Sequence, residues 1–156
     1  MKVAVQPLVA DNERSWSLTA ALHDVEVWRR RVDEAARALG ADRDAREVAE
    51  YGITELLSNV HKHVGEATDC RLVVEREGDA LCVRLSDTSH EVPQVLSADP
   101  LSENGRGLWL LRAMADDLGY TLIPEGKWVW VHTALRTAAL SGCGQESSST
   151  TRSRKW

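Results

Sequence analysis

The 156-residue sequence lacks phenylalanine altogether and has only three cysteines, Cys70, Cys82 and Cys143, which form no C-x-x-C pair. An odd, scattered set of this kind suggests neither a disulfide framework nor a zinc site. No apolar run approaches the roughly 20 residues of a membrane-spanning helix, and the first residues lack the apolar segment of a signal peptide. We therefore expect a cytoplasmic protein with no membrane partner.

An excess of positive charge is also missing. The formal net charge is −5, and the segment from Arg136 onward carries four basic residues against one acid. The net charge of the rest of the chain is therefore more negative than −5. Such a surface argues against a nucleic-acid partner bound through its phosphates, whereas a basic protein partner is compatible with it.

What the sequence does contain fits a single folded domain. Hydrophobic residues at 43% and charged residues at 28% are ordinary values for a globular protein of this length. We predict a domain over residues 1–140 and a tail over residues 141–156. The tail is rich in Ser, Thr and Gly and cannot bury enough apolar surface to offset its ordering entropy, so we expect it to be disordered.

Hydrophobic spacing and turn residues predict the order strand, helix, helix, hairpin, loop, helix, hairpin. The helices are expected over residues 25–39, from about 42 or 44 to 64, and over 107–118. The strands are expected over residues 16–21, 70–77, 80–87, 120–124 and 128–135. Because tight turns join the paired strands, the fold class should be α/β of the α+β type. We expect a two-layer sandwich, a mostly antiparallel sheet with helices on one face.

A polar row runs along the second predicted helix in the segment ITELLSNVHKHV. Glu55, Asn59 and His63 are spaced four apart and so share one side of the helix, beside the apolar stripe that includes Leu56 and Val60. A solvated helix face is the common explanation for such a row. Only its combination with other motifs favours a functional site.

The segment ENGRGLWLL joins the predicted loop to the third helix. Gly105 and Gly107 would let the backbone approach a ligand closely, and the free N–H groups of the first helical turn attract an anion. Arg106 adds a positive charge between them. A plain loop-to-helix turn, with Leu108 and Leu111 in the core, explains the same residues.

The segment RLSDTSHEVP ends an apolar strand with Asp87. A buried carboxylate needs hydrogen-bond donors, and the 6-amino group of adenine is one, whereas guanine presents a carbonyl acceptor there. The alternative is a turn capped by Asp87 together with Thr88 and Ser89.

In this order, the three motifs resemble the Bergerat-fold ATP-binding domains of the GHKL superfamily. The segments ITELLSNVHKHVG, VRLSDTS and GRGLWLLRAMADDLGY resemble most closely its bacterial anti-sigma-factor serine/threonine kinase branch, and the resemblance covers Val25 to Leu135. It implies a histidine-kinase-type ATPase domain that uses ATP and Mg²⁺. It also implies a protein kinase that phosphorylates a STAS-like anti-sigma antagonist and sequesters a sigma factor, in a branch whose members are often homodimers.

The resemblance also implies a role for each matching residue. Asn59 matches the asparagine whose side-chain oxygen coordinates Mg²⁺, and Glu55 matches the base that activates the attacking hydroxyl. Asp87 matches the aspartate that reads adenine. His63 matches a histidine often seen after the asparagine, and we assign it no definite role. The phosphate-side glycine box is matched by Gly105, Arg106, Gly107 and Leu108, and the loop over residues 88–104 would be the mobile lid.

The sequence departs from the family pattern at two positions. Ser89 stands where the family usually has glycine, and Lys127 replaces a threonine whose hydroxyl helps to bind the base. Both changes concern nucleotide affinity more than the fold. The missing glycine favours an alternative, a non-catalytic nucleotide-binding or degenerate module that regulates transcription only by docking a protein partner, whereas Glu55 favours catalysis. A hydrolytic metal site at His61, His63 and His90 is disfavoured, because residues two apart on a helix point to different sides.

Overall fold

The computed structural model describes residues 8–65, 67–93, 106–136 and 153–156. The strands are β1 Leu8–Ala10, β2 Glu13–Thr19, β3 Asp69–Glu77, β4 Ala80–Asp87, β5 Asp117–Ile123, β6 Gly126–Ala134 and β7 Ser153–Lys155. The helices are α1 Val25–Ala38, α2 Arg43–His63 and α3 Arg106–Met114, with a 3-10 turn, η1, at Leu22–Asp24. Of the helices in these ranges, none has the combined length and apolar character needed to cross a membrane.

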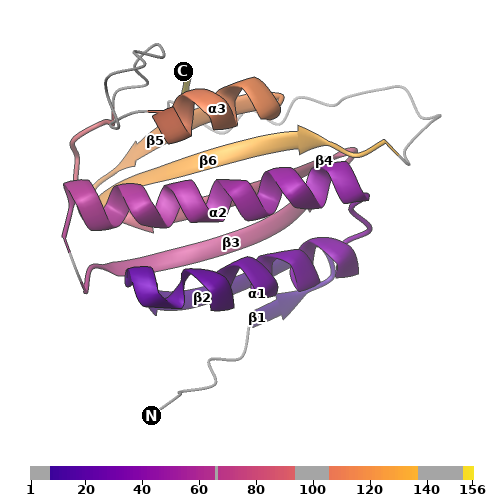
Figure 1. Ribbon diagram of the computed structural model, residues 1–156, viewed down its shortest axis with the longest axis horizontal. Helices are drawn as coiled ribbons and strands as arrows, with labels where there is room; N and C mark the ends of the chain where they lie inside the picture. Colours follow the sequence, from indigo (N-terminus) through magenta and orange to yellow (C-terminus); the bar gives the residue numbers. More distant parts are fainter. Residues whose placement is uncertain (1–7, 66, 94–105, 137–152) are drawn as a thin grey trace.

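Within the described residues, the strands form one seven-stranded sheet in the order β1-β2-β3-β4-β6-β5-β7. Every neighbouring pair is antiparallel. Figure 1 shows α1, α2 and α3 side by side on one face of this sheet, with α2 in the middle. The predicted two-layer α+β sandwich is therefore confirmed.

The core lies between the helices and the near face of the sheet. Helix α2 buries Ile53, Leu56 and Leu57 along one stripe, as its helical spacing predicts. Alternate residues of β4, such as Leu81 and Val83, meet this stripe, and their neighbours in sequence point to the opposite face. The packing fixes α2 against the centre of the sheet, so the polar row beside its apolar stripe has a fixed direction.

The third helix is shorter than the sequence predicts. Helix α3 ends at Met114, and Leu118, expected in its last turn, is a buried residue of β5. The backbone N–H of Asp116 donates to the carbonyl of His132 at 3.0 Å, and its Oδ2 accepts from the N–H of Ala134 at 2.6 Å. These two bonds tie the chain to β6 at the point where the helix would otherwise continue.

The prediction of a disordered tail is wrong for its last four residues. Ser153–Lys155 form β7, which pairs with β5, and the ring of Trp156 lies 5.2 Å from that of Tyr120. The backbone N–H of Trp156 also donates to the carbonyl of Leu118 at 2.9 Å. A single tryptophan supplies apolar surface that the rest of the tail lacks, and β5 offers a free edge for pairing. The remainder of the predicted tail, residues 141–152, lies outside the described residues.

Candidate nucleotide-binding site

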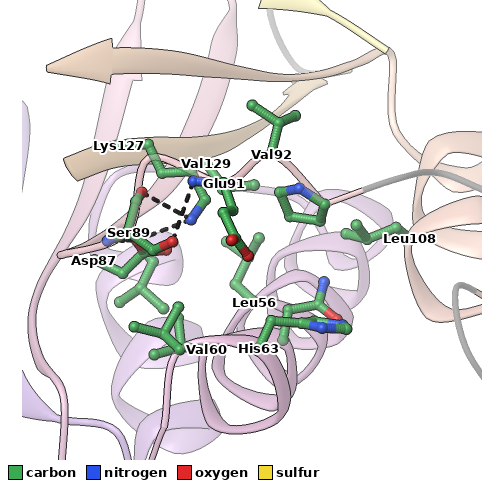
Figure 2. Close-up of a pocket in the computed structure, with 14 residues that line it drawn as sticks. Leu56, Val60, His63, Asp87, Ser89, Glu91, Val92, Leu108, Lys127 and Val129 are labelled. Atoms are coloured by element: carbon green, nitrogen blue, oxygen red, sulfur yellow. Dashed lines mark hydrogen bonds and ion pairs between the residues drawn. The ribbon is translucent and has the colours of Figure 1, made fainter.

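A cavity of about 260 Å³ opens between α2, the ends of β4 and β6, and the start of α3 (Figure 2). Its walls are largely apolar, as is usual for a pocket that receives a small molecule. They come from four separate elements: Leu56 and Val60 on α2, Leu85 on β4, Leu108 on α3 and Val129 on β6. Polar side chains also line it: Asn59, His63, Asp87, Ser89, Glu91 and Lys127.

The deepest charges in this cavity are Asp87 and Lys127, which are only 5% and 2% exposed. They are register partners on β4 and β6, and the Nζ atom of Lys127 lies 2.8 Å from Oδ1 of Asp87. Gly126 makes this approach possible, because its φ of +155° and its closeness to the Asp87 carbonyl leave no room for a Cβ. The carboxylate predicted to need donors therefore finds one within its own chain.

The hydrogen bonds of this ion pair are unevenly distributed. Oδ1 of Asp87 also accepts from the backbone N–H of Ser89 at 2.8 Å, while Nζ of Lys127 also donates to the Ser89 carbonyl at 3.1 Å. Among the described residues, the other carboxylate oxygen of Asp87 has no hydrogen-bond partner. An ammonium group has three N–H donors, and two of those of Lys127 are used. By this count Asp87 keeps one acceptor oxygen and Lys127 keeps one N–H donor, and both residues line the cavity.

Glu55 packs directly against the first turn of α3. A Cβ built on Gly107 would overlap both Oε2 and the carboxyl carbon of Glu55, so this contact requires glycine. Burial raises the pKa of Glu55, and the nearby Lys62 ammonium and Tyr51 hydroxyl oppose that rise. The result is a partly buried carboxylate, with elevated basicity, at the beginning of a helix.

Asn59 lies one helical turn beyond Glu55 and lines the cavity. Its Nδ2 atom is buried and, within the described chain, has no hydrogen-bond partner. A buried unpaired amide is costly in a folded protein, so this side chain is suited to an additional partner. Its carbonyl oxygen is a hard donor of the kind that Mg²⁺ prefers. The unpaired N–H group suits an anionic oxygen such as that of a phosphate, and the amide oxygen is one ligand that a magnesium ion carried by the phosphate could use.

The other predicted site residues are distributed as follows. His63 is exposed and lines the mouth of the cavity, while Leu108 is buried and forms part of its wall. Arg106 is the first residue of α3. Gly105 lies outside the described residues, as does most of the predicted lid. The three histidines His61, His63 and His90 do not converge on a metal site within the described ranges.

Two residues of the site were not assigned a role from the sequence. Tyr51 interacts with Glu55 from one turn earlier on α2, and its spacing of four residues could have revealed it. The sequence identifies Lys127 only as a departure from the family pattern, because it replaces a threonine whose hydroxyl helps to bind the base. Its pairing with Asp87 depends on the register of β4 against β6, which are separated along the chain by β5 and α3.

The fold and the cavity together define a nucleotide-binding α+β domain. Residues 18–133 match the histidine kinase-like ATPase domain family, and since this match spans well over half of the chain, the chain belongs to that family. The resemblance to GHKL-type domains is thereby confirmed. No curated protein matches the chain.

Gly107 offers a direct test of the contact with Glu55. Gly107→Ala is expected to destabilise the protein by about 1–3 kcal/mol, because the new methyl group overlaps the carboxylate. In a Glu55→Ala background the overlap disappears, and the same substitution should cost nothing or stabilise α3 by about 0.5–1 kcal/mol. Urea unfolding of the four proteins gives this comparison. An equal cost in both backgrounds would mean that the two residues do not touch.

Proposed function

We propose that this protein is a Mg-ATP-dependent serine/threonine protein kinase of the anti-sigma type. It phosphorylates a hydroxyl on a STAS-like antagonist protein and sequesters a sigma factor. The observation that carries the proposal is the position of Glu55 against the first turn of α3, one helical turn from Asn59. A module that only holds a nucleotide has no need of a carboxylate with raised pKa at that point.

The roles of the residues follow from their chemistry. Glu55 accepts the proton of the attacking hydroxyl, a task for which burial and its raised pKa prepare it. The N–H groups of the first turn of α3, which an α-helix leaves without intrahelical partners, would stabilise the phosphate oxygens. Asn59 would hold Mg²⁺ through its side-chain oxygen, and the bound ion supplies charge neutralisation on the phosphates.

Asp87 and Lys127 together are complementary to adenine. The unpaired carboxylate oxygen of Asp87 accepts from the 6-amino group, and the remaining N–H of Lys127 donates to the adjacent ring nitrogen N1. The apolar side chains of Leu56, Val60 and Val129 cover the faces of the ring. Guanine presents a carbonyl acceptor at the 6-position and an N–H donor at N1. Its carbonyl would therefore face the carboxylate of Asp87, and the two acceptors would repel each other.

One feature favours a second candidate function. Lys127 already occupies one oxygen of Asp87, and Ser89 stands where a glycine is usual. If this ion pair excludes the base, the protein is a degenerate module that regulates transcription only through docking. The two candidates differ in whether the nucleotide binds at all and whether phosphate is transferred.

Thermal unfolding with Mg-ATP and Mg-GTP distinguishes the kinase from the docking module. Mg-ATP at 100 times its dissociation constant should add about 2.7 kcal/mol to the free energy of unfolding, and Mg-GTP should add much less. Equal stabilisation by both nucleotides would contradict base reading by Asp87 and Lys127. A shift with neither would favour the docking module.

The phosphoryl-transfer step is tested with γ-labelled ATP and candidate antagonist proteins. We expect label on a serine or threonine of the antagonist, and none when the antagonist hydroxyl is replaced. The acidic composition of the chain is compatible with a basic sigma-factor surface as the second partner, and a homodimer is the assembly implied by the branch. ATP-dependent stabilisation without any label transfer would favour nucleotide-regulated docking.

A further inference from the structure

The face of the sheet opposite the helices carries a second group of chemically active side chains. In β4, Leu81 and Val83 belong to the core on the helix side, so Cys82 between them points to the other face. Cys82 and His132 are register partners on β4 and β6. Figure 1 shows that α1, α2 and α3 all cover the near face of the sheet, so this group lies away from the nucleotide cavity.

Three different ligand types converge on this face. One carboxylate oxygen of Glu77, at the end of β3, the Sγ atom of Cys82 and a ring nitrogen of His132 all lie within 4.8 Å of one another. Cys82 is buried, His132 is partly buried, and Glu77 is exposed. Because three hydrogen-bonded strands hold them, small side-chain rotations would bring all three to one ion.

The charges around this group are mixed. Glu75, two residues before Glu77 on β3, lies 3.9 Å from the guanidinium of Arg84 on β4. Asp117 is not an additional ligand, because Lys155 engages it at 3.1 Å.

We propose that Glu77, Cys82 and His132 form a binding site for a divalent transition metal of the zinc type. Thiolate, imidazole and carboxylate are together a donor set for Zn²⁺ and not for Mg²⁺. On binding, the Cys82 S–H bond breaks, a bond between sulfur and the metal forms, and the proton passes to solvent. Three protein ligands leave one tetrahedral position for water. The ion would link β3, β4 and β6, and this proposal does not depend on the kinase function.

The test is titration of the full-length protein with Co²⁺, a coloured substitute for Zn²⁺. Cys143→Ser serves as the background, since Cys143 lies outside the described residues. We expect a sulfur-to-cobalt charge-transfer band, visible bands of tetrahedral Co²⁺, release of one proton per ion, and loss of the colour when Zn²⁺ is added.

Variants distinguish this site from nonspecific binding. Cys82→Ser should remove the charge-transfer band, whereas Cys70→Ser, which alters a buried thiol on the helix side of β3, should leave it. If Cys82→Ser does not fold, His132→Gln and Glu77→Gln decide, because each should weaken Co²⁺ binding at least as much as the roughly 10–100-fold typical of lost outer-shell partners. No tetrahedral spectrum, or one that persists unchanged in all three variants, would overturn the proposal.

Discussion

Replacing Asp87 with alanine is expected to lower the free energy of unfolding by about 3–5 kcal/mol. The substitution leaves the ammonium of Lys127 buried beside an apolar side chain, since these two residues are almost fully enclosed and only 2.8 Å apart. Burying a charge without its partner is among the costliest single changes in a protein interior. Urea unfolding monitored by tryptophan fluorescence measures the loss.

A second substitution separates the ion pair from general damage. In the double variant Asp87→Ala with Lys127→Met, no charge remains in the cavity, so most of the lost stability should return. Glu47→Ala, which breaks an exposed ion pair with Arg43 on α2, should change stability little. Stabilisation by Mg-ATP should be absent from both Asp87 variants. A loss below about 1 kcal/mol in Asp87→Ala would mean that the buried pair does not form.

Glu55→Gln is expected to reduce phosphoryl transfer to the antagonist by about 10²–10⁴-fold. Glutamine keeps the size of the side chain, so its packing against Gly107 persists, but an amide cannot accept the hydroxyl proton. Stabilisation by Mg-ATP should remain, because Glu55 is not among the residues that line the cavity. Label transfer in single-turnover experiments measures the rate, and Glu47→Gln on the same helix should retain it.

The pH dependence of this reaction provides an independent check. Because burial raises the pKa of Glu55, the active carboxylate form is lost as the pH falls through that raised value. The acidic limb should therefore lie at a higher pH than an ordinary glutamate would give, and activity should be constant above it. A Glu55→Gln enzyme that keeps its rate, or its acidic limb, would exclude Glu55 as the base.

The local elements of this fold were predictable because their signals are local. Helix α2 has a continuous apolar stripe of helical period, and the β3–β4 hairpin turns at Gly78-Asp79. The strands β1 and β7 have three residues each and are exposed, so neither has an alternating pattern long enough to recognise. Both depend on pairing: β1 pairs with β2, which follows it directly in the chain, whereas β7 pairs with the distant β5.

The positions of the candidate site residues in the fold were predictable to the same degree. The spacing of Glu55 and Asn59 on one helix is a local property, and so is the position of Asp87 at the end of a strand. The ion pair between Asp87 and Lys127 is different, since it requires β6 to lie beside β4 with β5 beyond it. The metal-ligand group on the far face depends on the same arrangement, and no spacing in the sequence hints at it.

The two borders of the sheet differ in how they can receive another chain. Lys155 and its neighbours already fill the hydrogen-bonding groups of β5, so an incoming segment would have to displace residues 153–155 before it could add there. The opposite border is formed by β1, where Leu8 and Val9 are 72% and 64% exposed. If copies of this protein associate by extending their sheets, the first strand is the accessible place for such growth.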